Sequence, residues 1–173
     1  MYRNKSLNDF AETSRIELIN TVNNLDEDKL FEAFDLIKKA KAAGGRLHFT
    51  GIGKPSYVAR YSASLFSSTG MIAYFLDGTE TIHGSSGQVA EGDVVIAISN
   101  SGETEELKKS VTTLQRNGAV IIGVTGAAGS WLARNSDCVL LALSVLLQED
   151  YGLDLNKYKR WHPGGSIGAS IKE

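Results

Sequence analysis

The chain has 173 residues, enough for one domain with a sizeable core, and its 42% hydrophobic and 22% charged residues are typical of a folded globular protein. A net charge of −2 without a basic run argues against a nucleic-acid partner. The single cysteine, Cys138, excludes an internal disulfide. No apolar stretch is long enough for a bilayer and no signal-peptide core is visible, so we expect a cytoplasmic protein without a membrane partner.

The first 43 residues predict two helices, because apolar side chains recur in them at helical spacing. Asp26 is the expected N-cap of the second helix. Gly44-Gly45 is expected to end that helix through a left-handed backbone. We expect residues 1–43 to pack, as N-terminal helices, on a domain formed by residues 44–173.

Beyond residue 45, short apolar runs alternate with helical patterns and glycine-rich turns. Strands are predicted at residues 46–50, 71–76, 94–98, 119–124 and 137–141. Helices are predicted at residues 57–68 and 104–116, with a short helix at 131–134 and a polar loop or short helix at 79–88. This alternation predicts an α/β fold, a single domain with a five-stranded parallel sheet flanked by helices in three layers, α/β/α.

A hydroxyl-rich loop, Ser99-Asn100-Ser101-Gly102-Glu103-Thr104, follows the third predicted strand and precedes a helical pattern. In open α/β sheets, ligands bind outside the carboxyl ends of the strands. A helix N-terminus there offers free N–H groups and a partial positive charge, which suit a phosphate. The hydroxyls of Ser99, Ser101 and Thr104 therefore predict an anion-binding loop. The alternative is a helix start capped by Ser101 or Thr104.

A glycine turn that ends in a lysine, Gly51-Ile52-Gly53-Lys54, follows the first predicted strand. It lacks the third glycine of a dinucleotide fingerprint, because Ser56 stands at that place, and it is not a Walker motif. We interpret it as a turn that directs Lys54 toward an anion. A structural turn with a solvated lysine is the alternative.

Side chains suited to proton transfer accompany these loops. Glu106 is the candidate base, although a carboxylate in a helix's first turn is favourable in itself. His83 lies in a polar loop, and Pro163-Gly164-Gly165 holds His162 in place; an ordinary surface position is the alternative for both histidines. His48 is expected in the core or at a sheet edge. No cluster has metal-ligand spacing, so we expect neither a metal nor a cofactor.

The pattern fails after the fifth predicted strand. Residues 137–141 pass directly into a helical pattern at residues 143–149, with no turn residue between them. Connections between strands and helices usually take about 2–6 residues. We hypothesise that a segment near residues 141–144 is absent from this sequence. An intact mass that matches these 173 residues would contradict that hypothesis.

Three motifs together resemble the sugar isomerase (SIS) domain: the Gly51-x-Gly53-Lys54 turn, the Ser99–Thr104 loop and the His162-Pro163-Gly164-Gly165 tail. The turn and the tail are similar to the arabinose 5-phosphate isomerase (KpsF/GutQ-type) branch, here without the CBS domains of its long members. The resemblance extends from about residue 45 to the end of the chain. It implies a five-stranded parallel sheet, sugar-phosphate binding at the strand ends, and a homotetramer with sites at subunit boundaries.

The resemblance also implies a reaction, the reversible conversion of D-ribulose 5-phosphate into D-arabinose 5-phosphate through an enediol. The catalytic positions of the family fall on Lys54, Glu106, His162 and His83. Its phosphate-binding positions fall on Gly53, Ser99, Asn100, Ser101 and Thr104. Imidazole groups suit ring opening near neutral pH, a carboxylate suits proton transfer between carbons, and a lysine suits an oxyanion.

Two other functions stay open. Members of the family carry a further glutamate in a loop after the fifth strand, where this chain passes from residue 141 directly to a helical pattern. Loss of that carboxylate favours a non-catalytic sugar-phosphate sensor, although residues 1–43 contain no convincing helix-turn-helix. The second alternative is an isomerase of another sugar phosphate, such as a hexulose 6-phosphate.

Overall fold

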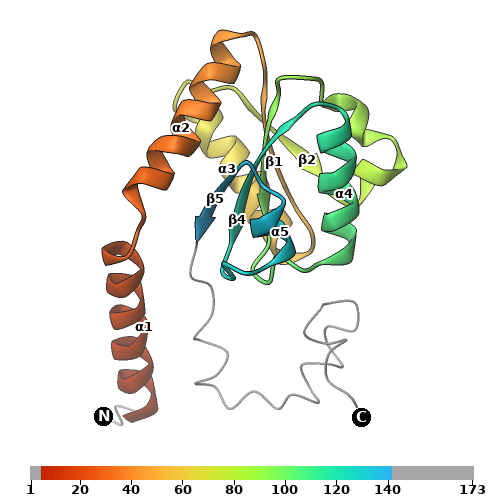
Figure 1. The fold of residues 1–173 in the computed structure, drawn as a ribbon. Coiled ribbons are helices and arrows are strands. Elements are labelled where there is room, and N and C mark those ends of the chain that lie inside the picture. Colours follow the sequence, from red (N-terminus) through yellow and green to blue (C-terminus); the bar gives the residue numbers. More distant parts are fainter. Residues whose placement is uncertain (1–4, 142–173) are drawn as a thin grey trace, which may run out of the picture. The chain divides into compact units, whose positions relative to one another are not determined.

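The computed structural model describes residues 5–141 of the chain (Figure 1). The chain divides into two compact units, of which Asp26–Ala142 is the larger. Helix α1 (Lys5–Asn23) belongs to the other unit. The packing of this helix on the domain, and a domain boundary at residue 43, remain predictions.

The centre of the larger unit is a sheet of five strands, all parallel, in the order β2-β1-β3-β4-β5. The strands are β1 (Leu47–Gly51), β2 (Ala73–Asp77), β3 (Val94–Ile98), β4 (Val120–Thr125) and β5 (Cys138–Leu141). Each strand begins within two residues of the predicted position, so the five-stranded parallel sheet is confirmed. Because all strands run in one direction, their carboxyl ends lie along one edge.

Helix α2 (Glu27–Ala42) precedes the first strand, whereas α3 (Lys54–Ser68), α4 (Glu105–Arg116) and α5 (Trp131–Arg134) each connect two strands that follow one another in the chain. Two 3₁₀ turns, η1 (Glu80–His83) and η2 (Ser85–Gln88), follow β2. Asp26 caps α2 as predicted, because its side chain accepts a hydrogen bond from the Lys29 N–H at 3.0 Å. Gly44, with φ of 85°, supplies the predicted left-handed stop.

Two apolar layers enclose the sheet, which confirms the three-layer arrangement (Figure 1). On one face, α2 and α3 contribute small or branched residues, namely Ala33, Ile37, Ala59 and Ala63. On the other face, α4 and α5 contribute leucine and valine side chains, namely Leu107, Val111, Leu114 and Leu132. Side chains alternate along β3, so that Val94 and Ile96 join the first layer while Val95 and Ala97 join the second.

Asp93, just before β3, joins the amino ends of β1 and β3. Its side chain is 3% exposed, and its Oδ1 accepts the Arg46 N–H at 2.8 Å. Its Oδ2 accepts the Ala90 N–H at 2.9 Å and the Arg46 Nη2 at 2.8 Å, and lies 3.3 Å from Nε2 of the buried His48. Burial alone would raise the pKa of Asp93, but the hydrogen bonds from Ala90 and Arg46 outweigh it, and this pKa lies below its ordinary value.

Replacement of Asp93 by Asn should lower the free energy of unfolding by about 2–3 kcal/mol at pH 7, less than for a fully buried ion pair because Arg46 is partly exposed. A carboxylate with a lowered folded pKa stabilises the fold above its unfolded pKa of about 3.9, and this contribution is lost as the pH falls through the folded pKa. Urea unfolding should therefore show wild type and Asp93→Asn converging at low pH.

The exposed Asp35→Asn on α2 is the control, and its stability should match wild type within about 0.5 kcal/mol. Equal stability of Asp93→Asn and wild type at pH 7 would show that Asp93 does not join the two strands energetically.

Candidate functional site

The structure brings three of the predicted site segments to the carboxyl edge of the sheet. Gly53 and Lys54 follow β1, His83 ends η1 after β2, and the Ser99–Thr104 loop follows β3. Because β1 pairs with both β2 and β3, the three segments are neighbours. Helix α4, which carries Glu106, contacts η1, which carries His83. The predicted catalytic His162 lies outside the residues that the structure describes.

The glycine turn places Lys54 at the first position of α3. Gly53, with φ of 66°, precedes it, and Pro55 occupies the second helical position. The helix therefore begins at residue 54 and not at residue 57 as predicted, because the break in the backbone falls at Gly53. Lys54 and His83 are both exposed.

The Ser99–Thr104 loop is held in shape by its own serines. The buried Ser99 Oγ accepts a hydrogen bond from the Gly102 N–H at 3.1 Å. The Ser101 Oγ accepts one from the Glu103 N–H at 3.2 Å. A hydroxyl that accepts one bond retains its own proton, so both serines can still donate to an anion.

The connection between β4 and α5 supports the same loop from its other side. The Asn100 carbonyl accepts hydrogen bonds from the Gly126 N–H at 2.9 Å and from the Thr125 Oγ1 at 3.1 Å. Gly102 has φ of 63°, and a Cβ added there would overlap the Oγ and Cβ of Ser130. Only glycine therefore fits between the loop and Ser130.

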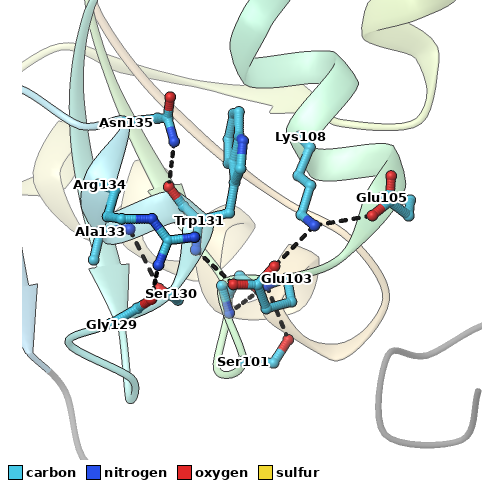
Figure 2. Close-up of polar contacts among 12 residues, drawn as sticks. Ser101, Glu103, Glu105, Lys108, Gly129, Ser130, Trp131, Ala133, Arg134 and Asn135 are labelled. Atoms are coloured by element: carbon cyan, nitrogen blue, oxygen red, sulfur yellow. Dashed lines mark hydrogen bonds and ion pairs between the residues drawn. The ribbon is translucent and has the colours of Figure 1, made fainter. Parts of the chain in front are cut away.

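Among the helices that begin at this edge, α4 and α5 differ in the use of their first N–H groups. In α5, the N–H groups of Trp131 and Ala133 donate to the Glu103 carboxylate and the Ser130 hydroxyl, at 2.6 and 3.2 Å (Figure 2). The Leu132 N–H donates to the Gly102 carbonyl at 3.0 Å. The N-terminus of α5 is thus filled by protein groups.

The N-terminus of α4 is open by comparison. Thr104 is its N-cap residue, but its side chain makes no capping hydrogen bond. Within residues 5–141, no acceptor is assigned to the N–H groups of Glu105, Glu106 and Leu107. The capped helix start weighed in the sequence analysis is therefore wrong for the Thr104 hydroxyl, and Ser101 binds the Glu103 N–H outside the helix. Within the described residues, three N–H groups without an acceptor thus lie beside serine hydroxyls, an arrangement whose chemistry suits an anion.

Two parts of this edge were not predicted from the sequence. Glu103 was predicted only as a member of the Ser99–Thr104 loop, yet its carboxylate accepts a hydrogen bond from the Trp131 N–H of α5. The connection at residues 125–130 was not assigned any role. Its only signal was position, because Thr125 ends a strand next to β3 in a parallel sheet. Among residues 5–141 no group of three or more His, Cys, Asp or Glu side chains is placed to hold a metal ion.

The chain belongs to the SIS domain family, whose model matches residues 41–145. It is 31% identical over 182 positions to the arabinose 5-phosphate isomerase KpsF of Escherichia coli, a match that covers 89% of this chain and 56% of that protein. It is 32% identical over 153 positions to the arabinose 5-phosphate isomerase KdsD of Shigella flexneri, covering 73% of this chain and 47% of that protein.

A solved structure, Escherichia coli CFT073 c3406 in complex with arabinose 5-phosphate, matches with a TM-score of 0.66 and 35% identity, over 81% of this chain and 74% of that chain. The chain spans about half the length of the curated relatives it matches. The match to KpsF runs over 182 positions but covers only 89% of 173 residues, so KpsF contains positions without a counterpart here. No helix in the described part of the chain is long and apolar enough to cross a membrane.

Replacement of Gly102 by Ala should displace the loop, because the new Cβ meets Ser130 and the positive φ is strained for alanine. We expect a loss of about 1–3 kcal/mol in stability, seen as a melting temperature lower by roughly 3–10 °C. Gly87→Ala is the matched control, since a Cβ there meets no atom within 4 Å. Equal melting temperatures for both variants would contradict the close fit of Gly102.

Proposed function

We propose that the chain is an aldose–ketose isomerase that converts D-ribulose 5-phosphate into D-arabinose 5-phosphate and back through an enediol. The observation that carries this proposal is the open N-terminus of α4 beside the serine hydroxyls, a site suited to a phosphate group. Family membership and the names of KpsF and KdsD support the choice of a sugar phosphate and of this reaction.

In this proposal the phosphate binds to the α4 N-terminus and to the preceding loop, through Gly53, Ser99, Asn100, Ser101 and Thr104. The sugar then extends from the phosphate toward the neighbouring ends of β1 and β2, where Lys54 and His83 lie. The N-terminus of α4 carries a partial positive charge, and this charge favours the binding of a phosphate dianion at the loop.

The chemical roles follow from the side chains at this edge. Isomerisation moves a proton between C1 and C2, and Glu106, in the first turn of α4, is the proposed base. Lys54 is proposed to stabilise the negative charge that develops on the sugar oxygen during enolisation. His83 and His162 are proposed to open the sugar ring, since imidazole both accepts and donates protons near neutral pH. No metal or cofactor enters this scheme.

The proposal includes an assembly and a location. Helix α3 exposes an apolar stripe of Tyr57, Val58, Tyr61 and Leu65, between 45% and 73% exposed, which supports a homo-oligomer and fits the proposed homotetramer. Sedimentation of the purified chain as a monomer would contradict that assembly. The proposed location is the cytoplasm. The proposed partners are small sugar phosphates, and neither nucleic acid nor a membrane is proposed as a partner.

The segment that was hypothesised to be absent near residue 141 bears on catalysis. The KpsF positions without a counterpart here are compatible with such a segment, although their place in the chain is not given by the match. If a catalytic carboxylate is missing, binding persists without turnover. The protein is then a sugar-phosphate sensor, and the activity assay separates the two functions.

The assay adds D-ribulose 5-phosphate to the purified chain in D₂O and follows aldose formation by proton NMR. An enediol mechanism with solvent exchange predicts deuterium at C2 of the aldose. Lys54→Met should lower kcat/KM by about 10²–10³, the usual cost of losing one group that stabilises an oxyanion. Lys109→Met, another exposed lysine on the same domain, should keep wild-type activity.

Tight binding with no turnover of ribulose 5-phosphate or of hexulose 6-phosphates would overturn the isomerase proposal and favour the sensor. Turnover of a hexulose 6-phosphate alone would favour an isomerase of that other sugar phosphate. Full activity of His162→Ala would remove that histidine from the mechanism.

A further inference from the structure

Glu103 connects the Ser99–Thr104 loop with α4 and α5 (Figure 2). Its Oε1 accepts the N–H of Trp131, the first residue of α5, at 2.6 Å. Its Oε2 lies 2.8 Å from the Nζ of Lys108, one turn into α4. Lys108 also pairs with Glu105 at 2.9 Å. One side chain from the loop thus reaches both α4 and α5.

This arrangement differs from the ordinary use of an acidic residue at a helix start. A capping carboxylate would accept N–H groups of its own helix, here α4. Glu103 instead accepts an N–H group 28 residues further along the chain, on α5. Close beside it, the Leu132 N–H donates to the Gly102 carbonyl at 3.0 Å. The loop is therefore fastened to α5 by two successive residues.

The charge of Glu103 needs compensation, because a free carboxylate this close to the anion site would repel a phosphate. Lys108 provides a positive charge, and the Trp131 N–H lies at the partly positive end of α5. The hydrogen bond from Lys108, followed by that from Trp131, lowers the pKa of Glu103 and so favours its ionised form.

The contacts of Glu103 and Gly102 with α5 also determine which of the two helix N-termini beside the loop, that of α4 or that of α5, keeps N–H groups without acceptors. Because Glu103, Gly102 and Ser130 take the first three N–H groups of α5, those of α4, and not those of α5, are left for an anion beside the Ser99–Thr104 loop. Without the Glu103 carboxylate, the Trp131 N–H loses its acceptor and the loop loses one of its two bonds to α5.

We propose that Glu103 is a positioning residue that fixes the Ser99–Thr104 loop, through Trp131 and Lys108, in the form that binds the phosphate of the substrate. This inference rests on the proposed function, since it takes a sugar phosphate as the ligand. Glu103 does not touch the reacting carbons in this account, so its replacement affects affinity before the chemical step.

The test compares Glu103→Ala and Glu103→Gln with wild type. Calorimetric titration with D-arabinose 5-phosphate should give a dissociation constant about tenfold higher for Glu103→Ala. Glu103→Gln should fall between Glu103→Ala and wild type, because its amide oxygen still accepts the Trp131 N–H but cannot pair with Lys108 as an ion. In the isomerase assay, Glu103→Ala should raise KM, whereas its kcat should differ from wild type by less than about threefold.

Amide hydrogen exchange provides a readout that does not depend on turnover or on ligand. Exchange at Trp131 and across residues 99–104 should be faster in Glu103→Ala. The control is Glu32→Ala on α2, which removes another surface carboxylate paired with a lysine, Lys29, at 2.5 Å. Its affinity and its exchange in the loop should equal those of wild type.

The outcomes separate this inference from the proposed function. If the wild-type chain binds D-arabinose 5-phosphate but shows no turnover, the isomerase proposal is overturned. The positioning role can then still be tested by comparing the affinity and amide exchange of wild type and the Glu103 variants. Wild-type affinity in Glu103→Ala, or unchanged exchange at Trp131 and in the loop, would overturn the positioning role even if the isomerase is confirmed. If Glu103→Ala does not fold, Glu103→Gln decides, and wild-type affinity together with wild-type exchange in that variant would overturn it.

Discussion

A helix can offer its first N–H groups to a ligand only where the protein leaves them without acceptors, and the site depends on this constraint. In α5 the first three N–H groups are consumed by Glu103, Gly102 and Ser130. In α4 the corresponding groups have no acceptor in the described part of the chain, and Thr104 does not cap them. The acceptors that fill α5 come from the loop that leads into α4 and from the residue just before α5. The same contacts that fasten the loop therefore occupy the N-terminus of α5 and leave that of α4 for an anion.

The sheet makes this arrangement possible. Since β3 lies at the centre of the order β2-β1-β3-β4-β5, its loop is flanked by the glycine turn after β1 and by the connection after β4. Asp93 joins β1 and β3 at the opposite edge through Arg46 and Ala90. The order of the central strands is thus fixed at one edge, while the other edge is left for loops. A rigid frame of this kind suits a site whose groups must keep their positions during proton transfer.

Much of the fold followed from local sequence patterns, and much of the site's geometry did not. The apolar runs, the glycine stops and Asp26 predicted the parallel sheet, the end of α2 and its cap, because each signal lies within a few residues of its effect. The position of the Ser99–Thr104 loop followed from the rule for strand ends. The bond from Glu103 to Trp131 and the fit of Gly102 against Ser130 join residues 28 apart in the chain, so no local pattern contains them. The sequence does not show that the N-terminus of α4 lacks a side-chain cap either. Threonine is a common capping residue, but the hydroxyl of Thr104 makes no capping hydrogen bond here.

We propose that α4, and not α5, binds the phosphate group of a sugar phosphate. The most direct measurement is a titration of the ¹⁵N-labelled chain with D-arabinose 5-phosphate, followed by TROSY NMR. The account predicts the largest amide shifts at Ser101 and at the first-turn residues Glu105, Glu106 and Leu107, with small shifts in α5. Largest shifts at Trp131 to Ala133, or saturation with no shift in the first turn of α4, would contradict it.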